Sequence, residues 1–208
     1  MSVDTSGSIV TIGGSSGEVI LGTSTNGATI ASTTGQLTYN GNARHTKYIT
    51  LTPEYAGATL SNSVWTGVGD IGTMTAGFDS GQDENFYQWT TSQSSNQAYD
   101  IVVSIPIPTD FSAWASSTPM TVDIKTSDTT NGIVTAKLYD TTKTIESSWN
   151  TCSLTPGSTS WTTVTGCAVS GTYSNSGGKV MTLIIQTQAP NGGTTEVGNI
   201  NLAYLSSF

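Results

Sequence analysis

The sequence predicts an all-β fold, an antiparallel sandwich of two sheets, and three observations support this prediction. Residues of high β-propensity, mainly Thr, Val, Ile and Tyr, recur in alternation with other residues along much of the chain. Residues that favour helix interiors are scarce, since only 10% of the 208 residues are charged. The apolar runs are short and are separated by turn-forming residues, among them 23 glycines, as short antiparallel strands require.

The first 41 residues form a leader in which a glycine precedes each β-type stretch. These stretches begin at Gly7, Gly17, Gly27 and Gly35. A unit this short cannot bury its own apolar side chains, so the pattern requires stacked neighbours or identical chains to cover them. We therefore divide the chain into a β-repeat leader, residues 1–41, and a head domain, residues 42–208. Three roles for the leader stay open: a shaft, a donor strand and a flexible linker.

The strands of the head domain are placed by apolar alternation and by the turn residues between them. In chain order they are expected at 47–52, 57–60, 64–68, 71–75, 86–90, 99–107, 120–126, 133–139, 143–145, 161–165, 180–187 and 197–205. The long closing strand is typical of a jelly roll.

Three connections have their own signals. A polar loop is expected from Phe78 to Asn85. The stretch from Asp110 to Trp114 is expected to form a single helical turn or a tight loop, with Thr109 or Asp110 as its cap. Asn131-Gly132 favours positive φ and indicates a hairpin that joins strand 120–126 to strand 133–139.

Cys152 and Cys167 lie in strand-like sequence on either side of a turn. This spacing suits a disulfide that closes a hairpin or a long loop, and two buried free thiols are the alternative. A disulfide would support an extracellular location.

Charge and hydropathy exclude two classes of partner. The formal net charge is −8, and the six basic residues are spread over the whole chain, so no patch can neutralise a run of phosphates. Nucleic-acid binding is therefore not expected. No apolar run approaches the roughly 18 to 20 residues that span a bilayer, so we expect no membrane insertion.

No catalytic pattern is present, and we predict that the chain is not an enzyme. His45 is the only histidine, and no nucleophile motif surrounds it. A glycosidase would need two facing acids, and no pattern pairs the available carboxylates, which are Asp70, Asp79, Asp83, Glu84, Glu146 and Glu196.

Two binding sites are candidates. The most acidic loop carries Asp79, Asp83 and Glu84, whose oxygens could surround a structural Ca²⁺, although the loop is not an EF-hand. A solvated acidic turn is the alternative. Among the five tryptophans, Trp149 and Trp161 lie among Ser, Thr and Asn residues and are the candidates for stacking on a sugar ring, whereas Trp89 and Trp114 are expected in the core or at its edge.

The order of features over residues 44–205 resembles that of jelly-roll domains in carbohydrate-binding modules and in fibre heads of phages and bacterial surfaces. The resemblance rests on Ile49-Thr-Leu-Thr, on the segment from Ile105 to Trp114, on the stretch 120–139 and on Gly198-Asn-Ile-Asn-Leu. The leader similarly resembles the glycine-punctuated shaft of trimeric fibres. Jelly-roll modules of this kind often carry a structural calcium, so the resemblance also implies a calcium site in this chain.

We therefore expect a non-enzymatic, extracellular structural or adhesive protein that is a component of a fibre or filament. The leader would drive self-association into a homotrimer or filament, and the head would present loops to a cell-surface glycan or receptor. The alternative is a carbohydrate-binding module of a larger secreted protein.

Overall fold

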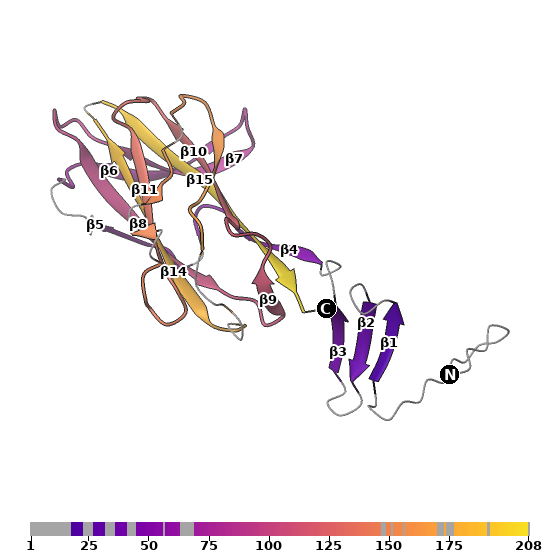
Figure 1. The fold of residues 1–208 in the computed structure, drawn as a ribbon. Helices are drawn as coiled ribbons and strands as arrows, with labels where there is room; N and C mark the ends of the chain where they lie inside the picture. The colour runs from indigo at the N-terminus through magenta and orange to yellow at the C-terminus, as the bar shows by residue number, and fades with distance from the viewer. Residues whose placement is uncertain are drawn as a thin grey trace.

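The computed structural model describes residues 18–22, 27–31, 36–40, 45–55, 57–62, 69–146, 149–150, 152–155, 157–169, 173, 177–190 and 192–207. All elements in these ranges are β-strands, which form three sheets (Figure 1). No helix among these residues is long and apolar enough to span a membrane.

The leader forms an antiparallel sheet of its own in the order β1-β2-β3 (Figure 1). Its strands are β1 (Glu18–Gly22), β2 (Gly27–Ala31) and β3 (Gln36–Asn40). They coincide with three of the four predicted repeats. The repeat that begins at Gly7 lies outside the described residues.

The head is an antiparallel sandwich of a seven-stranded and a five-stranded sheet, which confirms the predicted fold class. The seven-stranded sheet follows the order β13-β10-β15-β7-β6, and β4 and β9 also pair with β15. Its strands are β4 (Thr46–Leu51), β6 (Thr73–Asp79), β7 (Glu84–Thr90), β9 (Phe111–Trp114), β10 (Met120–Thr126), β13 (Thr162–Thr165) and β15 (Thr194–Ser206).

The five-stranded sheet has the order β12-β11-β14-β8-β5. Its strands are β5 (Thr59–Asn62), β8 (Gln97–Pro106), β11 (Ile133–Tyr139), β12 (Cys152–Ser153) and β14 (Val180–Ala189). The predicted strand at 64–68 lies outside the described residues, and of the predicted strand at 143–145 only an isolated bridge from Ile145 to Tyr139 forms.

The core lies between the two sheets because alternate residues of the facing strands point inward. On β8 these are Ile101, Val103 and Ile105, and on β10 they are Met120, Val122 and Ile124, all of them fully buried. Burying one side chain of this size contributes about 1.5–3 kcal/mol. On β10 the alternation leaves Asp123 and Lys125 on the outer face, away from the core.

The predicted hairpin between 120–126 and 133–139 is wrong, although both strands form with the predicted bounds. β10 pairs with β13 and β15, whereas β11 pairs with β12 and β14, so the connection crosses from one sheet to the other. Gly132 is not at positive φ; it lies so close to Thr126 that a Cβ would overlap the threonine hydroxyl. Alternation shows which face of each strand is buried, but it does not show whether two successive strands belong to the same sheet.

Two other connections also differ from the prediction. The stretch after Asp110 is the strand β9, which pairs with β15 and buries Phe111; only the turn before it, closed by the hydrogen bond from Phe111 N to Pro108 O, is tight. The polar loop is shorter than expected because β6 and β7 pair as far as Asp79 and Glu84.

Candidate functional site

A row of polar groups crosses the outer face of the seven-stranded sheet. The strand register places Lys125 of β10 opposite Glu196 of β15, and Glu196 opposite Gln88 of β7. Gln88 Nε2 donates to Glu196 Oε1 at 2.7 Å, and Lys125 Nζ lies 3.0 Å from Glu196 Oε2. The buried carboxylate of Glu196 therefore ties three strands together on this face.

Trp161 reaches across the same face from the β13 edge of the sheet. Its Nε1 donates to Asp79 Oδ2 at 3.0 Å, and its ring packs on Phe86 with 5.8 Å between ring centroids. Trp161 directly precedes β13, and Asp79 ends β6, the other end of the five-strand path. Four strand spacings of about 4.8 Å would keep these edges about 19 Å apart in a flat sheet. The sheet is therefore curled here, and its outer face is concave.

Two hollows of about 250 Å³ each lie beside Trp161 on this concave face. Trp161 and Gln82 line both of them. We call the two hollows together the Trp161 surface. The first is lined by Asp79, Gln82, Lys125, Thr159, Ser160 and Trp161, and the second by Gln82, Glu84, Asp123, Trp161, Thr162 and Thr163.

A β-bulge in β15 holds Glu84 in the second hollow. Val122 pairs with Ile200 while Ile124 pairs with Val197, so β15 has one extra residue at this point. The bulge residue Asn199 donates from its main-chain N to Glu84 Oε1 at 2.7 Å and from Nδ2 to Oε2 at 3.0 Å.

The carboxylate of Glu84 lies directly over Gly198. A Cβ at Gly198 would overlap Glu84 Oε1, so a larger residue here would displace the Glu84 carboxylate. Burial raises the pKa of Glu84 and the negative charge of Asp123 adds to this, although the hydrogen bonds from Asn199 oppose the rise.

The first hollow contains the one cation among the residues that line the two hollows. Lys125 Nζ lies 3.5 Å from Asp79 Oδ2 and 5.5 Å from the centroid of the Trp161 ring. The hydrogen bond from Trp161 and a second one from Gly81 N lower the pKa of Asp79. Burial opposes the charge on Lys125, but the contacts with Glu196 and Asp79 outweigh it and raise the pKa of Lys125.

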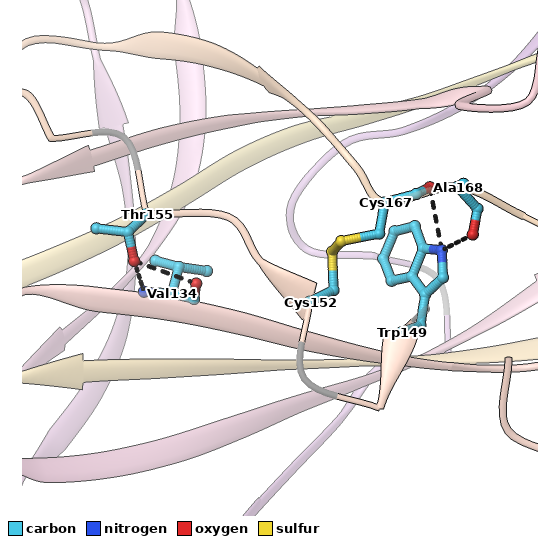
Figure 2. The surroundings of a disulfide bond; sticks show 6 residues. All are labelled: Val134, Trp149, Cys152, Thr155, Cys167 and Ala168. Carbon is cyan, nitrogen blue, oxygen red and sulfur yellow. Dashed lines mark hydrogen bonds between the residues drawn. A yellow bond between two sulfur atoms is a disulfide. The ribbon is translucent and has the colours of Figure 1, made fainter. Parts of the chain in front are cut away.

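The two tryptophans predicted as ligand contacts lie in different environments. Trp161 belongs to the surface described above. Trp149 is fully buried, and its Nε1 donates to Cys167 O and Ala168 O, both at 3.1 Å (Figure 2). Gly166 makes room for it, since a Cβ there would lie 2.7 Å from the Trp149 ring. Trp149 is thus a core residue, which does not fit the ligand contact predicted for it.

The predicted disulfide between Cys152 and Cys167 is confirmed (Figure 2). Cys152 lies on β12, the edge of the five-stranded sheet, and Cys167 follows β13, the edge of the seven-stranded sheet. The bond therefore links the two sheets at one open side of the sandwich. The segment that it closes carries Trp161.

The predicted calcium ligands do not form a cluster. Asp79 accepts from Gly81 and Trp161, and Glu84 accepts from Asn199. No group of three or more His, Cys, Asp or Glu side chains that could hold a metal occurs in the described part of the chain. These residues do not fit a bound calcium ion, and we derive no role for one.

Sequence reasoning missed Gln82, Asp123 and Lys125. A signal for two of them was present, because the alternation of β10 leaves Asp123 and Lys125 on the outer face. Gln82 belongs to the turn between β6 and β7, where nothing in the sequence distinguishes it from its polar neighbours.

No family model and no curated protein matches this chain. Among solved structures, the chain is similar to TmCBM61 in complex with β-1,4-galactotriose, with 6% identity and a TM-score of 0.38 over 76% of this chain and 88% of that one. It is also similar to a family 11 carbohydrate-binding module of a Clostridium thermocellum cellulase, with 14% identity and a TM-score of 0.37 over 77% and 95%. A third structure, of carbohydrate-binding modules from the β-sandwich superfamily, has 13% identity and a TM-score of 0.41 over 82% and 78%. At these identities and TM-scores the likenesses assign neither a family nor a ligand.

Proposed function

We propose that this chain binds an oligosaccharide or polysaccharide through the Trp161 surface. The observation that carries the proposal is the position of Trp161 between two polar hollows on a concave sheet face. An aromatic ring contacts the C–H face of a sugar, while carboxylate, amide and hydroxyl groups around it bond to the sugar hydroxyls. Hollows this polar do not suit an apolar ligand.

The arrangement of the hollows favours a ligand of repeated units. Trp161 and Gln82 are shared by both hollows, so a chain of sugars that crosses the ring would reach polar groups on each side of it. This supports the alternative function predicted from the sequence, a carbohydrate-binding module, over the fibre or adhesin. The disulfide supports an extracellular location for such a module, since disulfides persist in oxidising environments.

Self-association through the leader stays a prediction of the sequence. Light scattering coupled to size exclusion tests it, with the full chain compared with a chain that begins at Asn42. A trimer that becomes a monomer on truncation would favour assembly as a second role. Monomers in both cases would remove that role and leave the carbohydrate proposal intact.

Affinity gel electrophoresis tests carbohydrate binding. The full chain is run through gels that contain soluble β-glucan, galactan, galactomannan or xylan, and at least one of these polymers should retard it. Trp161→Ala should weaken binding about fivefold or more, because loss of an aromatic side chain at the centre of a binding site costs about 1 kcal/mol or more. Tyr48→Ala is the matched control, since Tyr48 is an exposed aromatic (67%) of the same sheet that lines neither hollow.

Thermal melting of both variants verifies that they remain folded. Retardation by none of the polymers would contradict the proposal, and so would a folded Trp161→Ala variant that binds as tightly as the parent.

A further inference from the structure

We infer that the glycan bound by the Trp161 surface carries no negative charge and that the surface rejects polyuronates. This inference deepens the proposed function and rests on it. Three observations on charge and hydrogen-bonding capacity carry it, and they concern the lining residues of the two hollows.

The first observation is the excess of carboxylates in the second hollow. Glu84 and Asp123 both line it, and no cationic side chain does. The two carboxylates lie close enough to interact, since the negative charge of Asp123 contributes to the raised pKa of Glu84. A ligand carboxylate placed here would add a third negative charge to two that already repel each other.

The second observation is that the cation of the first hollow is already paired. Lys125 Nζ lies 3.0 Å from Glu196 Oε2 and 3.5 Å from Asp79 Oδ2. An anionic ligand would have to compete with two carboxylates for one ammonium group. With Asp79, Glu84 and Asp123 ionised, the three lining carboxylates and one lysine leave a net charge of −2, and Glu196, which pairs with Lys125 from outside the lining, adds one more negative charge.

The third observation is that ionised carboxylates only accept hydrogen bonds. Asp79 and Glu84 accept two hydrogen bonds each, and Asp123 accepts one from Thr163 Oγ1 at 2.5 Å. A carboxylate has about four acceptor positions, so each retains capacity for a ligand donor. Sugar hydroxyls supply such donors, whereas an ionised uronate group supplies none.

The test compares one polysaccharide with its own oxidised form. Soluble β-glucan, galactan and galactomannan are each used before and after oxidation of their primary hydroxyl groups to carboxylates. In affinity gels at about 10 mM salt, where charges act over about 30 Å, the neutral form should bind at least about tenfold more tightly. This ratio should fall markedly in about 0.5 M salt, because the repulsion is then screened.

Two variants separate the local charge from the net charge of the chain. Asp123→Asn removes one carboxylate of the second hollow and should lower the neutral-to-oxidised ratio at low salt. Asp70→Asn removes the same charge at an exposed position that lines neither hollow, and it should lower the ratio less than Asp123→Asn does.

Equal or tighter binding of the oxidised form, or a ratio that responds to neither salt nor Asp123→Asn, would overturn this inference while carbohydrate binding stands. Failure of both forms of these three polymers, and of xylan, to bind would overturn the proposed function and this inference with it.

Discussion

Removing the disulfide should destabilise the head domain by about 3 kcal/mol. Cys152 and Cys167 are 15 residues apart, and closing a loop of that length lowers the entropy of the unfolded chain by an amount worth about 3 kcal/mol at 25 °C. In the double variant Cys152→Ala/Cys167→Ala, Trp149 keeps its hydrogen bonds to the main-chain carbonyls beside Cys167, and loss of the buried Cys152 sulfur adds a cavity cost (Figure 2). Domains are typically stable by about 5–15 kcal/mol, so the variant should still fold.

Urea unfolding at equilibrium measures this loss. The oxidised parent, the reduced parent and the double variant are compared, and the last two should both have lower midpoints. In both proteins the free energy of unfolding should fall with urea concentration at least as steeply as in the oxidised parent, because an uncrosslinked chain exposes more surface when it unfolds. A loss below about 1 kcal/mol in the double variant would refute the reasoning from loop-closure entropy.

Two further predictions concern other polar contacts of the head. Tyr173→Phe should lower the free energy of unfolding by about 1–3 kcal/mol in urea, because the buried Tyr173 hydroxyl donates to Glu146 Oε1 at 2.6 Å; an unchanged midpoint would contradict this. Asp110→Asn should lower the melting temperature more at about pH 7 than at about pH 2, because the hydrogen bond from Lys47 lowers the pKa of Asp110. The stability that this lowered pKa contributes is lost progressively as pH falls through it. Equal effects at both pH values would show that charge is not the cause.

The sequence predicts the strands of the head well where alternation is strong. The bounds of β10 and β11 are as predicted, because each strand has one apolar and one polar face. Strand pairing is harder to predict from the sequence, because the path of the chain between the two sheets decides which strands become neighbours. The hairpin expected at Asn131-Gly132 failed for this reason.

The site was predicted only in part, for a related physical reason. Trp149 and Trp161 have similar polar neighbours in sequence, yet one is buried beside Gly166 and the other lies on the concave face. The contact between Trp161 and Asp79 joins residues 82 positions apart and depends on the curl of the whole sheet. The sequence indicates that Asp79 and Glu84 belong to one acidic loop, but their partners Trp161 and Asn199 come from distant parts of the chain.

The most direct test of the account follows the indole N–H signals of the five tryptophans by NMR during titration with neutral gluco-, galacto-, manno- and xylo-oligosaccharides. The Trp161 signal, assigned by its disappearance in Trp161→Phe, should shift with at least one of these ligands, because its Nε1–H bonds to Asp79 inside the first hollow. The signals of the buried Trp89 and Trp149 should stay in place. A Trp161 signal that moves with none of the ligands, or shifts confined to the other tryptophans, would contradict the claim that the Trp161 surface binds carbohydrate.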